Sequence, residues 1–406
     1  MKRVWIISRF YAEETGTGYV LTRTAEGLTE YFSVHVLCGQ PDYVDHERRA
    51  PLRESVNGVT IIRVRSTGFS NKSLLIKVLN MLSSSLLIFF KTLQNVGRDE
   101  PVLIVNLPPL LPFLALLACR IKRAKTMLLI HDVYPDTLVA SAVQSQASLS
   151  TRIAEWMFKR LYRSVDRIVV LGRDMQALIA NKLRSDPTEI LVIPNTTDVE
   201  CVYPLQRDEN VLLRELGLEN KFVLKYAGHM GRTHGLELLT EAARRIAPID
   251  PQIHFLFMGD GPKKQWLIDE VARHELGNVS VKPYWPRAQI VSSINACDVG
   301  LISMMPGMTG VSVPSRVYDL LAAGKPVIVI AEKSSELALM AQEEKIGWVV
   351  SPNDVDALVK TIQEAKANPR LLAEMGVHAR KIAEEKYARR HQIDAYCNLI
   401  LSLDVA

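Results

Sequence analysis

Arg316 and Asp319 stand three residues apart in a stretch, residues 310–330, that reads as a polar loop, a short helix and a buried strand. Ser315 is the expected N-cap of this helix, and Gly324 is its expected end. The free N–H groups at a helix start can hold a diphosphate, and an arginine can add a charge-assisted fork. Asp319, one turn further on, can accept hydrogen bonds from the diol of a sugar or a ribose. The alternative is an ordinary helix–strand unit without a ligand.

His131 and Asp132 form a second candidate pair. They follow the apolar run 126–130, which predicts a buried strand, and they precede a turn that contains Pro135. Ligands of open parallel sheets bind beyond the carboxyl ends of the strands, so we expect both side chains at a cleft. A single histidine in such a place can also be a hydrogen-bonded structural residue.

Glycine-rich turns follow three of the expected strands. Gly16 and Gly18 follow the first one, but the dinucleotide-binding fingerprint requires a third glycine where this chain has Leu21. Residues 226–235 (YAGHMGRTHG) contain a strand end, a turn and a helix start, and are a second candidate phosphate cradle. Residues 259–262 predict a simple turn.

Runs rich in β-forming residues alternate with helical patterns along the chain. The runs lie at residues 3–8, 33–38, 59–65, 102–105, 126–130, 166–171, 221–227, 253–259, 279–282, 298–303, 327–330 and 347–350. This alternation predicts an α/β protein with parallel, doubly wound sheets. A Pro-Asn turn followed by polar sequence predicts an N-terminal domain of residues 1–200 and a C-terminal domain of residues 201–383. A last helix, at about 384–406, is long enough to return to the first domain.

The composition is that of a folded protein with large cores. The chain has 406 residues, of which 48% are hydrophobic and 23% charged. The five cysteines are scattered, and the nine histidines show no metal-ligand spacing, which predicts a reduced, cytoplasmic chain without a metal site. The single Asp-x-Asp, residues 354–356, is expected to begin a helix. No signal peptide is expected, because the apolar run 4–8 is too short.

The positive charge is concentrated in the first half of the chain. Residues 1–200 hold 25 Lys and Arg against 19 Asp and Glu, whereas residues 201–406 hold 24 against 25. This distribution suggests an anionic partner of the first half, such as a membrane surface or a phosphorylated lipid. Nucleic acid is not expected, because it would require denser basic clusters interleaved with aromatic residues.

Three segments of the first half bear on that partner. Residues 72–93 and 107–125 are apolar but interrupted, and neither has the ~18 uninterrupted apolar residues of a spanning helix. Both can lie in a membrane interface with lysines reaching the headgroups, or both can be core helices of the sheet. Residues 153–164 predict an amphipathic helix whose polar side, with three cations, is a solvated face.

Five pieces of sequence, in this order, resemble the retaining glycosyltransferases of the GT-B fold, glycosyltransferase family 4. They are residues 15–18 (TGTG), 131–136 (HDVYPD), 193–198 (IPNTTD), 226–235 (YAGHMGRTHG) and 313–328 (VPSRVYDLLAAGKPVI). The resemblance covers essentially the whole chain. The last piece is most similar to a subgroup that builds bacterial O-antigen, capsule or exopolysaccharide chains on polyprenyl-diphosphate lipids.

The resemblance implies two Rossmann-like domains facing across a cleft, with a nucleotide-sugar bound by the C-terminal one and no metal or other cofactor. It implies that Asp319 grips the ribose, that Arg316 acts on the diphosphate, and that His131 and Asp132 lie near the reacting sugar. The implied catalytic residues are His131, Asp132 and Arg316, and the implied donor-binding residues are Gly16, Thr17, Gly18, Gly228, His229, Arg232, His234, Ser312, Val313, Pro314, Ser315, Arg316 and Asp319.

The sequence departs from the family pattern at several of these positions. His229 and His234 stand where the family usually has an arginine and a lysine, and are expected to be weaker, pH-dependent cations. Val311 stands where the first acid of the paired-acid motif is expected, and Asp319 replaces the usual glutamate of the second. These differences favour a donor sugar without the usual hydroxyl pattern, such as an amino- or deoxy-sugar.

The leading hypothesis is a glycosyltransferase that moves a sugar from a UDP-sugar to a lipid-linked diphosphate saccharide. It would work in bacterial surface polysaccharide synthesis, at the cytoplasmic face of the inner membrane, as a peripheral protein. Two alternatives are a nucleotide-sugar epimerase of similar architecture and an inactive nucleotide-sugar-binding partner in a membrane assembly.

Overall fold

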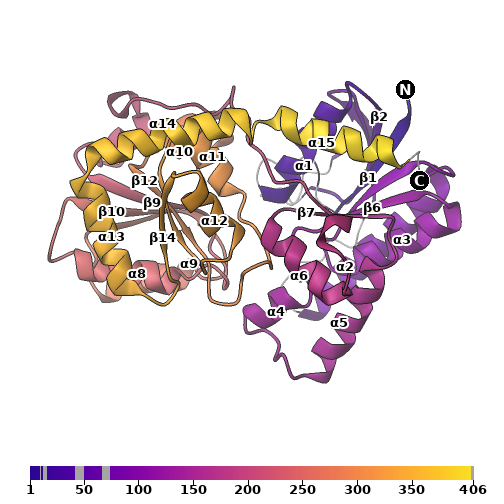
Figure 1. Cartoon of the computed structure of the whole chain (residues 1–406), viewed down its shortest axis with the longest axis horizontal. Helices are drawn as coiled ribbons and strands as arrows, with labels where there is room; N and C mark the ends of the chain where they lie inside the picture. The colour runs from indigo at the N-terminus through magenta and orange to yellow at the C-terminus, as the bar shows by residue number, and fades with distance from the viewer. Residues whose placement is uncertain (10, 12–15, 42–49, 66–73, 404–406) are drawn as a thin grey trace. The chain divides into compact units, whose positions relative to one another are not determined.

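The computed structural model describes residues 1–9, 11, 16–41, 50–65 and 74–403, which form two units (Figure 1). The first unit contains residues 1–136, 145–194 and the chain from 390 onward, and the second contains residues 137–144 and 195–389. The main division, between residues 194 and 195, falls close to the predicted boundary at residue 200. The eight residues 137–144, predicted in the N-terminal domain, group instead with the second unit.

The first unit is built on an eight-stranded sheet with the order β3-β4-β2-β1-β5-β6-β7-β8. Its strands are β1 (Arg3–Ile7), β2 (Ser33–Cys38), β3 (Arg53–Val56), β4 (Val59–Arg63), β5 (Pro101–Val105), β6 (Lys125–Leu129), β7 (Arg167–Val170) and β8 (Ile190–Val192). All neighbouring strands pair in parallel except β3 and β4. The central strand β5 reads PVLIV and is buried throughout, as expected for a parallel strand covered on both faces.

Among the described residues, seven helices lie before β8 in the sequence or from residue 389 onward, of which the one at Asp136–Ala140 falls almost entirely in residues 137–144 of the second unit; a short 3₁₀ turn, Pro187–Glu189, precedes β8. The helices are α1 (Gly16–Leu28), α2 (Leu74–Asn95), α3 (Leu111–Lys122), α4 (Asp136–Ala140), α5 (Leu149–Tyr162), α6 (Arg173–Leu183) and α15 (Arg389–Ser402). Helix α15 packs against α1. The contact includes a 2.9 Å hydrogen bond that the Thr24 hydroxyl donates to the Gln392 side chain. A Cβ atom at Gly27 would lie 2.1 Å from the Ile393 side chain, so only glycine permits this close packing.

The second unit is built on a six-stranded parallel sheet with the order β11-β10-β9-β12-β13-β14. Its strands are β9 (Phe222–His229), β10 (Ile253–Asp260), β11 (Val279–Lys282), β12 (Val299–Ser303), β13 (Val327–Ile330) and β14 (Gly347–Val350). Its helices are α7 (Val211–Glu215), α8 (Leu236–Ile246), α9 (Lys264–Arg273), α10 (Ile290–Asn295), α11 (Arg316–Ala322), α12 (Glu336–Glu343), α13 (Val355–Ala367) and α14 (Pro369–Glu385), with 3₁₀ turns at Arg207–Glu209 and Arg287–Gln289.

The core of the second unit positions helix α11. Leu236, Leu239, Ala243 and Ile246 recur at helical spacing and form the buried face of α8, which packs on the sheet. On α11 the corresponding anchor is Leu320, whose side chain lies over Gly300 of β12. A Cβ atom at Gly300 would lie 2.4 Å from Leu320 Cδ1, so the glycine lets α11 approach the sheet closely.

Candidate active site

Arg316 is the first residue of α11, and its side chain lies at the carboxyl end of β9. Its Nη1 donates a 3.1 Å hydrogen bond to the carbonyl of Ala227, and its guanidinium carbon lies 4.5 Å from the centre of the Tyr226 ring. Gly228 has a φ of +140°, and a Cβ atom there would lie 3.2 Å from Arg316 Nη1. The glycine therefore provides both the turn after the strand and the space for the guanidinium.

Ser315 occupies the N-cap position of α11, but its side chain makes no capping hydrogen bond. Its backbone is already in the right-handed helical region, with φ −71° and ψ −17°, in which the hydroxyl cannot reach back over the first turn in the usual way. Ser312, Pro314 and Ser315 are half-buried, whereas Val313 is buried. The residues predicted to present N–H groups thus form the approach to α11, without the predicted serine cap.

His229 and His234 lie on the two sides of the glycine-rich turn, with their ring centres 6.3 Å apart. Burial, and then the positive charge of Arg316, lower the pKa of both imidazoles, and the pKa of His234 falls to about 2. The fold therefore disfavours the charged form of His234, contrary to the expectation that it acts as a cation. Arg316 supplies the positive charge at this end of the sheet, and Arg232 is exposed in the turn between the two histidines.

Asp319 lies one turn after Arg316 and is half-buried. Its Oδ1 accepts a 2.7 Å hydrogen bond from the hydroxyl of Thr197. The backbone of Thr197 is itself fixed, because its N–H donates to the carbonyl of Tyr387 at 3.0 Å and its carbonyl accepts from Arg389 at 3.2 Å. Two segments far apart in the sequence, around residues 197 and 388, therefore run side by side next to Asp319.

Lys225 is a buried lysine near Asp319 that was not among the residues predicted from the sequence. It lies in β9, and its ammonium group donates to the backbone carbonyl of Ser293. Burial lowers its pKa to about 8, while the negative charge of Asp319 acts in the opposite direction. A lysine inside the apolar run FVLKY was the signal in the sequence, since lysine is almost never fully buried unless it is paired.

Glu332 is a second residue that was not predicted from the sequence, and it holds the loop that precedes α11. Its carboxylate accepts hydrogen bonds from the hydroxyl of Thr309 and, at 3.3 Å, from the N–H of Gly307. Val311 stands where the family's paired-acid motif has its first acid, and its side chain is only 3% exposed. The loop is therefore held by Glu332, and the position of the missing acid is part of the apolar core.

His131 and Asp132 follow β6 in the first unit, as predicted, and Asn106 holds them. Asn106 follows the neighbouring strand β5; its Oδ1 accepts from the N–H of His131 at 3.0 Å, and its Nδ2 donates to the carbonyl of Asp132 at 2.6 Å. Burial lowers the pKa of His131 to about 4 and raises the pKa of Asp132 to about 6. Within the described part of the chain, His131 Nε2 is a buried atom without a hydrogen-bond partner. Asn106 was missed, although it is a polar residue at the end of an apolar strand.

The predicted glycine loop of the first unit is partly helical. Residues 12–15 lie outside the described residues, and Gly16 and Thr17 begin helix α1. Gly18 is buried in the first turn of α1, where its carbonyl accepts a 2.7 Å hydrogen bond from the hydroxyl of Thr22. The glycine-rich turn expected at Gly16 and Gly18 is therefore part of helix α1, which runs from Gly16 to Leu28.

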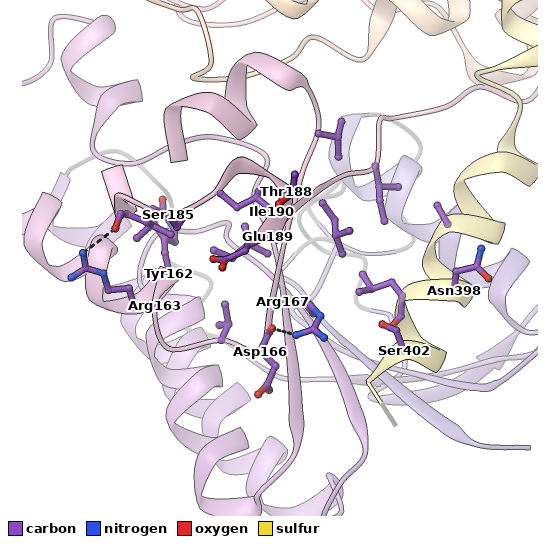
Figure 2. A pocket seen from close by; sticks show the side chains of 18 residues that line it. Tyr162, Arg163, Asp166, Arg167, Ser185, Thr188, Glu189, Ile190, Asn398 and Ser402 are labelled. Carbon is purple, nitrogen blue, oxygen red and sulfur yellow. Dashed lines mark hydrogen bonds between the residues drawn. The ribbon is translucent and has the colours of Figure 1, made fainter. Parts of the chain in front are cut away.

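Among residues 1–9, 11, 16–41, 50–65 and 74–403, no group of three or more His, Cys, Asp and Glu side chains is arranged to hold a metal ion. A cavity of about 970 Å³ lies in the first unit, between the edge of the sheet at β7 and β8 and helix α15 (Figure 2). Figure 2 shows Arg167 donating to the carbonyl of Asp166 in its wall, with Asn398 on α15 opposite. None of the predicted site residues lines this cavity.

Two family models match the chain, one for each half. The model described as "Glycosyl transferase 4-like domain" matches residues 15–196, and the model described as "Glycosyl transferases group 1" matches residues 209–382. Together they include every predicted site residue. The chain thus matches glycosyltransferase models in both of its units.

Curated relatives agree with the family models. The chain is 30% identical to a probable glycosyltransferase, WbjE, of Pseudomonas aeruginosa, over 82% of each chain, and 25% identical to a putative colanic acid biosynthesis glycosyl transferase, WcaI, of Escherichia coli K12, over 80% of each. It is 23% identical, over 56% of its own length and 58% of the relative's, to the Escherichia coli UDP-Gal:alpha-D-GlcNAc-diphosphoundecaprenol alpha-1,3-galactosyltransferase.

Solved structures share the fold over the whole chain. Sucrose-phosphate synthase of Thermosynechococcus elongatus aligns with a TM-score of 0.79 at 17% identity, covering 100% of both chains. HepE of Anabaena, solved with UDP-glucose, aligns with a TM-score of 0.74 at 15% identity, covering 99% of this chain and 100% of the other. Two parallel-sheet α/β domains of this kind constitute the GT-B fold, which confirms the predicted fold class.

Proposed function

Since the chain belongs to the group 1 glycosyltransferases, with a 4-like N-terminal domain, we propose that it is a retaining enzyme of bacterial surface polysaccharide synthesis. In this proposal it transfers a sugar from a UDP-sugar to a polyprenyl-diphosphate-linked saccharide. The observation that carries the proposal is the fixed guanidinium of Arg316 at the carboxyl end of β9, where parallel α/β sheets bind their ligands.

Arg316 is suited to act on a departing diphosphate. One of its N–H groups donates a hydrogen bond to the carbonyl of Ala227, and its planar face lies over the ring of Tyr226. The guanidinium is therefore held in one orientation before the ligand binds. A guanidinium has five N–H donors, so further donors remain for phosphate oxygens. A preorganised cation stabilises charge that grows on the leaving group, and therefore lowers the barrier to transfer. The neutral His229 and His234 would add hydrogen bonds.

Asp319 is the proposed ribose-binding residue. An ionised carboxylate has about four acceptor sites, so hydroxyl groups of a ribose can bind beside the hydroxyl of Thr197. The choice of UDP is supported by HepE, which was solved with UDP and with UDP-glucose, and by the galactosyltransferase relative, whose name specifies UDP-Gal. The same name specifies a lipid diphosphate acceptor, which supports the acceptor class proposed here.

The donor sugar is proposed to be an amino- or deoxy-sugar. The support is Val311, an apolar and buried side chain where an acid would accept hydrogen bonds from sugar hydroxyls. His131 and Asp132 are the proposed catalytic groups of the first unit, with a neutral imidazole and a carboxyl group whose pKa, about 6, lies near the working pH. No metal is proposed to take part, since Arg316 supplies the positive charge.

A peripheral position at the cytoplasmic face of the inner membrane follows from the lipid-linked acceptor. Of the residues that the structure describes, none lies in a helix both long and apolar enough to cross a bilayer. The alternative of an inactive nucleotide-sugar-binding partner is favoured by one observation, the buried Val311. It predicts binding of UDP without any transfer.

The first experiment is a thermal-shift panel with UDP, GDP, ADP and dTDP in EDTA. Stabilisation by UDP alone is expected, because a ligand that binds only the folded state must raise its stability. Transfer is then measured with UDP-sugars, UDP-N-acetylhexosamines and UDP-deoxysugars on a short-chain lipid diphosphate saccharide, and retention is read from the anomeric configuration of the product. Binding of UDP without product from any donor would support the inactive partner, and isomerised donor without acceptor would support the epimerase. A loss of turnover in EDTA would contradict metal-independent transfer.

A further inference from the structure

Helix α2 of the first unit is arranged with its apolar side outward. Its exposed face carries six large apolar side chains that are between 39% and 55% exposed: Val78, Leu79, Leu82, Leu86, Leu87 and Phe90. Its inward face is mostly polar, since Asn80, Ser84, Ser85 and Thr92 are at most 5% exposed beside the single buried apolar side chain of Ile88. A surface helix in water has the opposite arrangement, with its apolar side towards the core.

Two hydroxyls of the inward face are paired within α2, whereas Ser85 Oγ is a buried atom without a hydrogen-bond partner among the described residues. The Thr92 hydroxyl donates to the carbonyl of Ile88 at 2.8 Å, and the Ser84 hydroxyl donates to the carbonyl of Met81 at 3.0 Å. Small side chains allow α2 to pack closely on α3, whose inward residues Ala115 and Ala118 are also small and fully buried. Helices that pack through small and hydroxyl-bearing residues, with large apolar residues facing away, are typical of proteins surrounded by lipid.

The apolar exterior continues onto the two neighbouring helices. Helix α3 exposes Leu117 and Ile121, and it contacts α5 through the rings of Phe113 and Phe158, whose centres lie 5.1 Å apart. Helix α5 exposes four apolar side chains at helical spacing, among which Trp156 is 63% exposed: Leu149, Ile153, Trp156 and Met157. The cations Arg160 and Arg163 are exposed, as predicted for the polar face of this helix, but apolar residues occupy much of the rest of its exposed side.

Positive charge accompanies this apolar exterior. By sequence, α2 contains two lysines and no acid, and α3 contains an arginine and a lysine and no acid. Helix α5 contains three cations and one acid, Glu155, which pairs with Lys159 at 3.1 Å and also with Lys182. Arg152 and Arg160 are exposed on α5 beside the apolar residues. Apolar residues with a tryptophan, flanked by cations, are the composition of segments that lie in the interface of an anionic bilayer.

We propose that the outer faces of α2, α3 and α5 form a lipid-docking surface that lies in the interface of an anionic bilayer. Insertion of Phe90, Trp156 and their apolar neighbours removes these side chains from water, and Arg152 and Arg160 contact the phosphate groups of the lipids. A second copy of this chain fits less well, because a two-fold contact would pair this positively charged surface with the identical positively charged surface of the other copy. The surface would bring the enzyme of the proposed function to its lipid-linked acceptor, but its lipid binding can be measured without any transfer reaction.

The test measures co-sedimentation of the full chain with vesicles of phosphatidylethanolamine and phosphatidylglycerol, and with vesicles of phosphatidylcholine alone. The wild type should bind the anionic vesicles, and each exposed arginine replaced by glutamine should weaken binding about fivefold at low salt. The pairs Ile153→Gln with Trp156→Gln, and Leu82→Gln with Leu86→Gln, should each weaken binding at least about tenfold. The matched control, Leu371→Gln with Val377→Gln, replaces two exposed apolar side chains on α14 of the second unit and should bind like the wild type.

Three results would overturn the proposal. They are no binding of the wild type to anionic vesicles, equal binding by the α2, α5 and control pairs, and a dimer in solution that the α2 or α5 pairs dissociate. The dimer, measured by light scattering, would assign this surface to a second copy. Circular dichroism and the thermal shift with UDP show whether each variant folds and binds its donor. If vesicle binding follows the prediction while no donor yields product, the proposed function fails and the lipid-docking surface stands.

Discussion

The hydroxyl of Thr197 donates a 2.7 Å hydrogen bond to Oδ1 of Asp319, 122 residues away in the sequence. Thr197 lies three residues after Pro194, where the first unit gives way to the second, and its backbone pairs with residues 387–389. The residue proposed to bind the ribose is therefore anchored to the two segments at which the chain leaves and re-enters the first unit.

Asp319→Ala is expected to weaken the binding of UDP by about 1–3 kcal/mol, the cost of losing hydrogen bonds to a charged group. Thr197→Val removes only the hydroxyl that orients the carboxylate, so it should weaken binding less. Calorimetric titration with UDP measures both. Unchanged affinity in Asp319→Ala would remove Asp319 from the binding site, and an equal loss in both variants would mean that the Thr197 bond, and not the ribose, accounts for the effect.

Arg316→Gln is expected to lower kcat by about 10²–10³-fold with a smaller change in KM, if the guanidinium stabilises charge on the departing diphosphate. The matched control is Arg273→Gln, an exposed arginine on α9 that pairs with Glu270. Steady-state kinetics with saturating acceptor separates the two parameters. A rise in KM alone would show that Arg316 binds the donor without acting on the transition state.

The stability of the protein is expected to fall as the pH is lowered from about 7 to about 5. The folded state lowers the pKa of His131 to about 4 and that of His234 to about 2, while the unfolded chain takes up protons near pH 6.5. The unfolded state therefore binds more protons in this range, which favours unfolding. The raised pKa of Asp132, about 6, opposes part of this effect because the folded state takes up a proton there.

Melting temperatures of the wild type and of His234→Gln, measured between those two pH values, test this expectation. The variant should lose less stability on acidification, since it lacks one of the groups that must stay neutral in the folded state. His378→Gln, on the exposed side of α14, is the control. Parallel curves for the wild type and His234→Gln would show that His234 is not held neutral by the fold.

Val311→Glu, which restores the first acid of the family pattern, is expected to destabilise the protein by about 2–5 kcal/mol rather than to improve transfer. Val311 is 3% exposed, and an unpaired carboxylate is costly in such a place. Val311→Thr, of similar volume, should cost less. Denaturant unfolding gives the free energies. A stable Val311→Glu with higher activity on ordinary hexose donors would show that this position reaches the sugar.

The sequence predicted the sheets well because their strands are continuous apolar runs, and it predicted where His131, Asp132 and Arg316 lie because polar residues directly follow or face strand ends; their roles stay predictions. It missed strand β3, although Asn57 and Gly58, both with positive φ, form a tight turn typical of a hairpin. Lys225 and Glu332 were not predicted either, because only the tertiary fold brings Lys225 to the carbonyl of Ser293 and Glu332 to the hydroxyl of Thr309.

Helical periodicity identified the amphipathic segments, but it could not show which side faces the protein. For α2 the apolar side faces outward, and on its inward side Ser84 and Thr92 pair their hydroxyls with carbonyls of their own helix while α2 packs against α3. For α5 the buried side is formed by Phe158, Leu161 and Tyr162, which leaves Ile153 and Trp156 outside. Neither orientation follows from spacing alone.

The place of α15 has a consequence for synthesis of the protein. This helix, Arg389–Ser402, packs against α1 through Gln392 and Ile393, yet it is translated only after the whole of the second unit. The N-terminal half therefore cannot bury its α1 surface when it leaves the ribosome, whereas the second unit already has all of its strands. The first unit is synthesised first, but it lacks α15 until the end of translation. A nascent chain that is stalled before residue 389 should therefore need a chaperone for its N-terminal half.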